Sequence, residues 1–278
     1  MLKMMHIVFS LVAALAVAVV LNACGGTTSG KGQASSGKAV AQVGNSAITA
    51  PEVNHWMQVL TAGDYVLVSH GHPVPAGLVS EPPNYGACAA RLEAAAANAA
   101  KTLGASAAKE HLTPTPSQLL VKCQQLYQAI KLQAIAYLVN EQWVVNVAKE
   151  LGVTASAAEV TKAFDRFKTE RFPKGAGLDK YLAERNLSLP DEMVIEKLDV
   201  LGQKLQEKMR AGGQTAIGSL AQAEQKWAAK TSCPAGYVFE HCQQYHGQTT
   251  PAVPSQGVLL EQVAAISGVH CVNRPACG

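Results

Sequence analysis

SQLLVKCQQLYQAIKLQAIAYLVNEQWVVNVAKELG, residues 117–152, is the stretch around which the rest of the chain is organised. Its apolar or small side chains form two rows at helical spacing, Leu119, Cys123, Leu126, Ile130, Ala134, Leu138, Val145 and Ala148 in one and Tyr127, Ile135, Val139 and Trp143 in the other. The pattern predicts one long helix with Ser117 as N-cap and Gly152 as its end. About 35 residues at ~1.5 Å each make a rod of roughly 50 Å. A helix so apolar on more than one side needs other helices packed along it, so we expect a mainly α fold.

Composition bounds the class of protein. The chain has 278 residues and 48% hydrophobic residues, enough to form a core. Its formal charge of +3 is small and evenly spread, which argues against nucleic-acid binding. After the N-terminal region, no apolar run is long enough to suggest a membrane-spanning helix.

The N-terminus predicts export. Lys3 precedes an apolar run over residues 7–21, and Leu21-Asn22-Ala23-Cys24 resembles a bacterial lipobox. We expect residues 1–23 to be a lipoprotein signal peptide and Cys24 to carry the lipid that holds the protein at the extracytoplasmic face of a cell membrane. The alternatives are an ordinary signal peptide with an unrelated cysteine and a retained signal anchor.

Three regions follow the expected signal peptide. Residues 24–38 are rich in Gly, Ser and Thr and predict a flexible tether. Residues 39–231 are expected to form a helical domain that opens with a minimal β-hairpin around Gly44-Asn45. Thr49 and Glu52 have capping-box spacing for the next helix. Further helices are predicted over 154–172, 178–185, 190–209 and 217–230. Ser156 and Glu159 fit a capping box at the start of the first of these helices, and Gly212-Gly213 is a stop between the last two. Residues 232–278 are expected to be a largely irregular, Cys-containing tail.

Cysteine usage fits an oxidising compartment. If Cys24 carries lipid, an even number of cysteines is left, which in an exported protein suggests disulfides. Six cysteines can pair in many ways, and pairing between sequence neighbours is the simplest arrangement: Cys88–Cys123, Cys233–Cys242 and Cys271–Cys277.

Metal, cofactor and catalytic sites have weak sequence support. The chain has no CxxC pair, and His241 beside Cys242 is not a ligand set, so we expect no metal and no cofactor. His70 and His72 lie in a Pro-rich stretch and are expected to be exposed polar residues. Ser69-His70, Glu52 and Asp64 could be assembled into a catalytic group on paper, but no GxSxG, HExxH, P-loop or dinucleotide pattern accompanies them.

Several segments together resemble the SurA/PrsA-type extracytoplasmic foldases. The segments are VAQVGNSAITAPEV, QWVVNVAKELGVTASAAEVTKAFDRFKTERFP, LDKYLAERNLSLPDEMVIEKLDVLGQKLQEKM and QKWAAKTSCPAGYVFEHC, and in this order they span about residues 40–245. The resemblance implies a SurA-N/trigger-factor-like helical chaperone domain. Family enzymes carry a parvulin prolyl isomerase domain between the two halves of this domain. Here the helix ending near Met209 is followed almost at once by the helix beginning near Ile217, so no isomerase domain is expected.

The leading expectation is therefore a membrane-tethered holdase or foldase that binds unfolded, newly exported polypeptides. Its candidate client-binding side chains are Trp56, Tyr127, Trp143, Phe164 and Met193, although for any one of them an ordinary place in the core is the more common role. Two alternatives are an accessory envelope lipoprotein with one dedicated partner and a divergent peptidyl-prolyl cis-trans isomerase.

Overall fold

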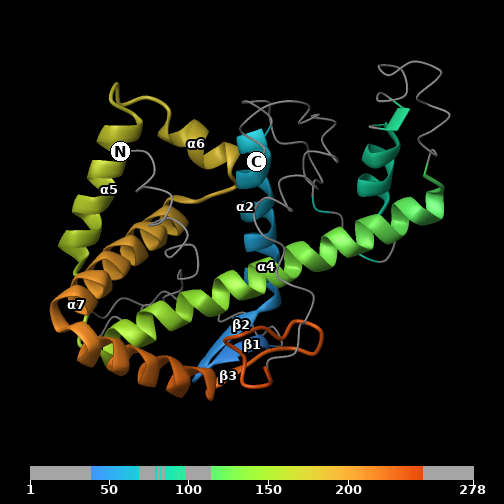
Figure 1. The fold of residues 1–278 in the computed structure, drawn as a ribbon. Coiled ribbons are helices and arrows are strands. Elements are labelled where there is room, and N and C mark those ends of the chain that lie inside the picture. The colour runs from blue at the N-terminus through green and yellow to red at the C-terminus, as the bar shows by residue number, and fades with distance from the viewer. Residues whose placement is uncertain are drawn as a thin grey trace, which may run out of the picture. The chain divides into compact units, whose positions relative to one another are not determined.

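The computed structural model describes residues 39–68, 79, 82, 85–94, 96–97 and 114–246, with the backbone alone for residues 64–68. This part of the chain is mainly helical and carries one small sheet (Figure 1). The elements in chain order are β1 (Ala39–Val43), β2 (Ser46–Thr49), α2 (Ala50–Val68), α4 (Pro116–Glu150), α5 (Ala157–Arg171), α6 (Leu178–Glu184), α7 (Leu189–Ala228) and β3 (Thr231–Ser232). Residues 86–94 are also helical.

The predicted long helix is confirmed as α4, with one correction at its start. Thr115, not Ser117, is the N-terminal cap: its hydroxyl accepts from the backbone N–H of Gln118, and the Gln118 amide oxygen accepts from the Thr115 N–H at 2.8 Å. This is a capping box formed by a Thr and a Gln, with Pro116 at the first helical position, where its missing N–H costs nothing. Gly152 ends the helix as expected, with φ at 67°, while the Val153 N–H reaches back to the Ala148 carbonyl.

The small sheet has three strands in the order β2-β1-β3. The hairpin around Gly44-Asn45 is confirmed, with β1 antiparallel to β2. The third strand, β3, was not predicted; it pairs with the other edge of β1 through Gln42 opposite Ser232 and Val43 opposite Thr231. A strand of two residues has no periodicity to detect, so only the tertiary pairing identifies it.

The chain divides into two compact units. Of the described residues, the first unit contains 39–53, 135–178 and 188–246, and the second contains those between 54 and 134 together with 179–187. Both α2 and α4 run from one unit into the other.

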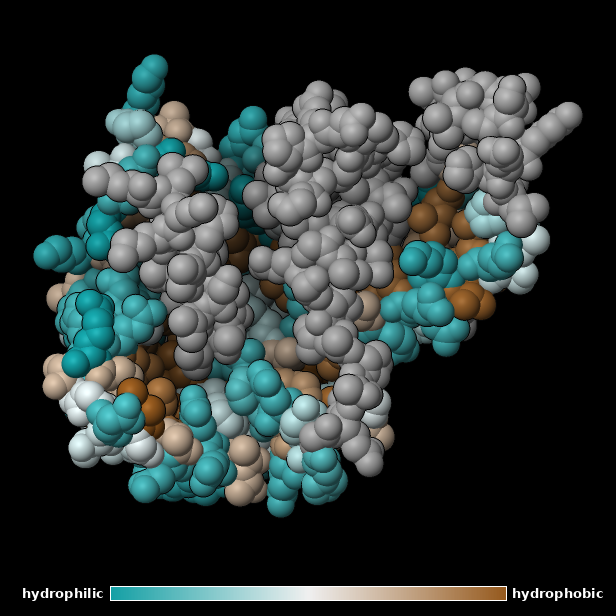
Figure 2. Space-filling model, in the orientation of Figure 1, coloured by the Kyte–Doolittle hydropathy of each residue, from teal (hydrophilic) through white to brown (hydrophobic). Residues whose placement is uncertain are grey.

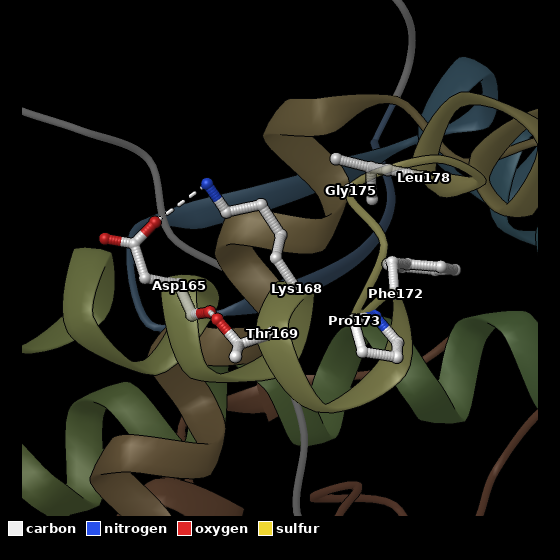
Figure 3. A pocket seen from close by; sticks show the side chains of 7 residues that line it. All are labelled: Asp165, Lys168, Thr169, Phe172, Pro173, Gly175 and Leu178. Atoms are coloured by element: carbon white, nitrogen blue, oxygen red, sulfur yellow. Dashed lines mark hydrogen bonds and ion pairs between the residues drawn. The ribbon is translucent and has the colours of Figure 1, made fainter.

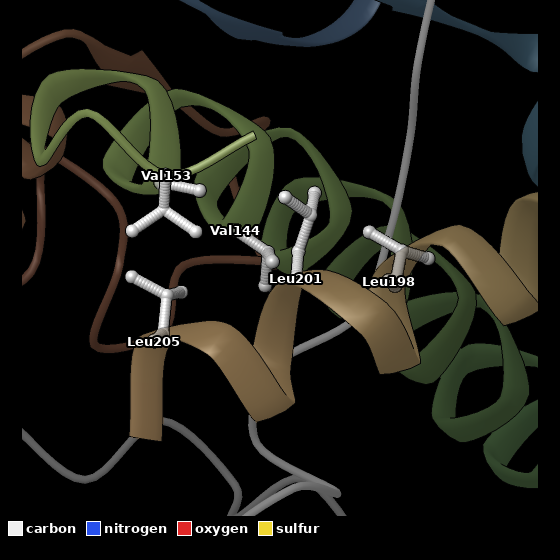
Figure 4. Packing of buried hydrophobic residues seen from close by; sticks show 6 residues of the cluster. Val144, Val153, Leu198, Leu201 and Leu205 are labelled. Atoms are coloured by element: carbon white, nitrogen blue, oxygen red, sulfur yellow. The ribbon is translucent and has the colours of Figure 1, made fainter. Parts of the chain in front are cut away.

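The core of the first unit lies where the second half of α4 packs on α7 (Figure 4). Val144 and Ala148 of α4 are fully buried, and Leu198, Leu201 and Leu205 of α7 pack against them together with Val153. The three leucines follow i, i+3, i+7 spacing and therefore share one face of α7. Small side chains on α4 let the leucines of α7 approach closely, which gives dense packing.

The predicted break at Gly212-Gly213 is confirmed. Gly213 has φ 52° and ψ −140°, and this non-helical residue separates two helical halves of α7. The first half begins at Leu189, one residue before the predicted start at Pro190, because Ser188 is its N-cap and forms a capping box with Asp191.

Disulfides hold both units. In the second, Cys88–Cys123 joins the helical residues 86–94 to the first turns of α4, and Tyr85 packs edge-on against Tyr127 at 5.9 Å. In the first, Cys233–Cys242 closes the loop after β3 and buries Phe239 beside it. Both pairs were predicted. Cys24, Cys271 and Cys277 lie outside the described residues, as do the predicted tether and the rest of the tail.

Gly44 offers a test of how the hairpin is fitted to the end of α7. Its φ is 59°, and a Cβ at this position would lie 2.9 Å from Cζ3 of Trp227. We expect Gly44→Ala to lower the free energy of unfolding by at least about 1–2 kcal/mol, because an L side chain is strained at this φ even before the clash. Gly218→Ala is the matched control, since nothing lies within 4 Å of a Cβ at this helical position, and it should stabilise by about 0.5–1 kcal/mol. Denaturant unfolding measures both changes. Equal changes in the free energy of unfolding would contradict the close fit of Gly44 against Trp227.

The two disulfides should differ in their effect on stability. The Cys88–Cys123 pair spans 35 residues and Cys233–Cys242 spans 9. In the chain-entropy model, removing the first pair with two Cys→Ala changes should cost roughly 4 kcal/mol and removing the second roughly 2.5 kcal/mol. Urea unfolding of the two double variants provides the comparison, and the reverse order would show that native contacts, rather than loop closure, set the effect.

Candidate functional site

Most of the predicted client-binding side chains are core residues in this structure. Trp56, Tyr127, Trp143 and Phe164 are 6%, 9%, 3% and 8% exposed. Met193 is half-buried. The sequence placed these residues on apolar helix faces, and the faces are covered by neighbouring elements. In this conformation the first four side chains therefore contribute little surface to a client.

The large apolar side chains that are exposed lie elsewhere. Leu120 and Val121 near the start of α4 are 42% and 52% exposed, and Figure 2 shows apolar surface at that end of α4. In the first unit, Leu189, Ile217 and Tyr245 are the exposed ones among the described residues. They are spaced singly along the chain, and single exposed apolar residues are common on protein surfaces.

A groove of about 460 Å³ lies at the C-terminal end of α5. Its lining comes from three consecutive segments: Asp165, Lys168 and Thr169 of α5; Phe172, Pro173 and Gly175 of the connecting loop; and Leu178 at the start of α6. Figure 3 shows the Asp165–Lys168 ion pair on one side and Phe172, Pro173 and Leu178 on the other. The groove thus combines apolar walls with a charged edge.

An aromatic row backs this groove. Phe164 and Phe167 stack at 6.2 Å between ring centroids, and Phe172 meets Phe167 edge-on at 5.7 Å. Lys168 lies 4.8 Å above the Phe164 ring while its ammonium group pairs with Asp165 at 2.8 Å. The spacing of Phe164 and Phe167 was visible in the sequence, but the return of Phe172 onto the row was not, because a turn produces it.

The turn that shapes the groove is specified locally. The Phe172 N–H donates to the Lys168 carbonyl and the Gly175 N–H donates to the Phe172 carbonyl, both at 2.8 Å. Gly177 has φ 118°, and a Cβ there would lie 3.2 Å from the Phe172 ring. Glycine at this position therefore lets the chain pass close to the aromatic row on its way to α6.

The opposite end of α5 is anchored to α7. Ser156 and Glu159 form the capping box that the sequence predicted. The Glu159 carboxylate also pairs with Lys204 of α7, and Lys204 donates to the Thr154 carbonyl at 2.8 Å. The hydrogen bond from Lys204, followed by those from Ser156, lowers the pKa of Glu159 to about 2. These contacts attach the N-terminal end of α5, the helix that carries the groove, to α7.

A buried polar seam between α4 and α7 was not predicted. Glu141 and Glu192 are each 2% exposed. Burial, followed by the charge of Glu141, raises the pKa of Tyr137 well above its usual range. The signal was a glutamate inside an otherwise apolar stretch of the long helix, which is costly to bury without partners.

The described residues contain no group of three His, Cys, Asp or Glu side chains that could hold a metal ion. In the same residues, no helix is both apolar and long enough to cross a bilayer. Of the candidate catalytic residues, Glu52 caps α2, with its carboxylate accepting from the Thr49 N–H at 2.7 Å. The Asp64 side chain, Ser69, His70 and His72 lie outside the described part.

Comparison with protein-family models, with curated proteins and with solved structures found no match for this chain.

Glu159 provides a pH test of the α5 anchor. Because its pKa is lowered from 4.5 to about 2 in the folded state, the carboxylate stabilises the fold above pH 4.5 and loses this effect as the pH falls from 4.5 towards 2. We expect Glu159→Gln to be less stable than the parent at neutral pH and equally stable near pH 2. Thermal unfolding across this range tests it. Glu207→Gln, at an exposed position of α7, is the control, and a stability gap for Glu159→Gln that persists near pH 2 would contradict the mechanism.

Proposed function

We propose that the protein is a membrane-tethered extracytoplasmic chaperone that holds apolar segments of newly exported polypeptides and has no prolyl isomerase domain of its own. The observation that carries the proposal is the groove at the end of α5, with its aromatic row and apolar wall. A groove of this kind can accept one large apolar side chain of an extended client segment, such as Leu or Phe. Weak, reversible binding of this kind lowers the concentration of free aggregation-prone chain.

The layout of the helices supports a SurA-N-type framework. The segment that resembles the start of the foldase chaperone domain forms β1, the turn, β2 and the first turn of α2. The two segments that would flank an isomerase domain are the halves of α7, which meet at Gly213. After α7 the chain returns to pair β3 with β1. The first and last described parts of the first unit are thus joined in one sheet.

Export and anchoring are part of the same proposal. The lipobox-like segment ending at Cys24 supplies the anchor, and the two disulfides are stable in an oxidising compartment outside the cytoplasm. A lipid anchor would place the groove close to the membrane where exported chains emerge.

Light scattering tests the activity directly. We expect the protein to suppress aggregation of a chemically unfolded model substrate during refolding, and to leave a proline-limited refolding rate unchanged in a parallel assay. Faster proline isomerisation would instead support a divergent isomerase. If neither assay responds, the general chaperone proposal fails and a single dedicated partner becomes the better hypothesis.

A groove-filling variant tests the site. Thr169 is exposed and lines the groove, so Thr169→Trp should occupy it without removing a core contact. Losing one buried apolar side chain costs about 1.5–3 kcal/mol, so client binding should weaken at least about tenfold. Thr161→Trp is the matched control, because Thr161 is exposed on the same helix and does not line the groove. Equal suppression of aggregation by both variants would exclude this groove as the client site.

A further inference from the structure

Trp143 is covered by the segment that follows β3. Its indole N–H donates to the Thr231 hydroxyl at 2.9 Å, and that hydroxyl donates to the Trp227 carbonyl at 2.8 Å. The imidazole of His241 lies against the indole with 4.2 Å between ring centroids, and Phe239 meets His241 edge-on at 5.8 Å. Trp143 is only 3% exposed as a result of this packing. The Trp143 side chain is thus covered by Thr231 of β3 and by the imidazole ring of His241.

The covering segment, residues 233–246, has little regular structure of its own. The Cys233–Cys242 disulfide closes it, and the Cys242 N–H donates to the Phe239 carbonyl at 2.8 Å. The Gln243 N–H donates to the Thr231 carbonyl at 2.7 Å. The disulfide and these hydrogen bonds hold the segment together and attach it to β3. Its contact with α4 is made by the His241 ring, which packs against Trp143. The segment could therefore leave Trp143 and still stay attached at the disulfide and β3.

His241 is the titratable group in this contact. Its Nδ1 atom is buried without a hydrogen-bond partner. Burial lowers the pKa of His241 from 6.5, and the negative charge of Glu240 opposes the change. The groups around His241 are the rings of Trp143 from α4 and Phe239 from the loop. The nearby Thr231 hydroxyl of β3 already donates its hydrogen to the Trp227 carbonyl. On α7, Glu224 feels the charge of Glu240, and Lys230, just after the helix, lies over the Trp227 ring.

Protonation would place a cation at a site that offers no acceptor to the buried nitrogen. The indole face attracts a cation, but the lost hydration of a buried imidazolium outweighs one ring contact. Once the loop is released, His241 regains water and its ordinary pKa. The open arrangement therefore binds the proton more tightly than the covered one, so a fall in pH below 6.5 favours opening.

We propose that residues 233–246 are a pH-sensitive cover, which detaches from α4 when His241 is protonated and exposes Trp143 as additional apolar surface for a client segment. The evidence for the opening is the packing of His241 against Trp143. The use of the exposed surface by clients rests on the function proposed above.

Nuclear magnetic resonance of the indole N–H groups tests the opening directly, on the full chain purified as the cell processes it. The Trp143 resonance is assigned by its loss in Trp143→Phe. Between about pH 7.5 and about pH 4.5 we expect this resonance to lose the shift that the neighbouring His241 ring imposes and part of its protection from solvent exchange, with a midpoint below the ordinary histidine value, while its hydrogen bond to Thr231 of β3 remains. The titration of the His241 ring, followed in the same samples, should have the same midpoint. A protected Trp143 throughout, or a His241 midpoint above the ordinary value, would overturn the proposal.

Two variants separate this switch from general acid unfolding. His241→Phe keeps a ring against Trp143 but cannot be protonated, so its Trp143 resonance should not respond to acid. Glu240→Gln removes an exposed charge that favours protonation, so opening should need a lower pH than in the parent. If Glu240→Gln opens at the parent midpoint, the proposal is overturned, and this test holds even if His241→Phe fails to fold.

Client binding at the two pH values distinguishes the cover from the proposed function. Opening accompanied by stronger binding of an unfolded model substrate in the parent, but not in His241→Phe, supports both. Opening without any substrate binding at either pH supports the cover and contradicts the chaperone function. Substrate binding with Trp143 protected at every pH contradicts the cover alone.

Discussion

The packing of α4 against α7 is the contact on which the rest of the first unit depends. Val144 and Ala148 are small enough for Leu198, Leu201 and Leu205 to fill the space between the two helices. Burying each such leucine contributes about 1.5–3 kcal/mol, which is a large fraction of the net stability of a typical domain. Two ion pairs flank this packing, Glu159 with Lys204 and Glu150 with Lys226. Because their side chains are partly exposed, they contribute little to the free energy of unfolding and act mainly by orienting the helices.

Once α4 and α7 are joined, the remaining elements have little freedom. The end of α7 delivers Trp227 onto the hairpin turn at Gly44, where only glycine leaves room for the ring. The chain then pairs β3 with β1, and Thr231 connects Trp143 of α4 to the Trp227 carbonyl. One buried hydroxyl thus links the long helix, the sheet and the end of α7. Breaking a hydrogen bond between buried groups is costly because water cannot reach the donor and acceptor to replace it.

The candidate sites differ in what holds them. The groove at the end of α5 is made from one continuous stretch, residues 165–178, so its shape depends on a local turn and on the anchor at Glu159. The cover over Trp143 brings His241 onto a residue far away in the chain and depends on the whole fold of the first unit. Local construction makes the groove insensitive to distant changes, whereas the cover responds to anything that alters the charge or position of His241.

The sequence by itself determined the elements with strong local signals. Apolar periodicity specified α4, spacing of Ser156 and Glu159 specified the start of α5, Gly213 specified the break in α7, and two neighbouring cysteine pairs were joined as expected. These features depend on backbone preferences within a few turns, or on pairs close in the chain. Only the tertiary structure decided that Trp56, Tyr127, Trp143 and Phe164 are covered, that β3 exists, that Phe172 joins the aromatic row and that His241 lies on Trp143. An apolar face looks the same in sequence whether a client or the protein's own chain covers it, because the hydrophobic effect has no direction and does not specify the partner.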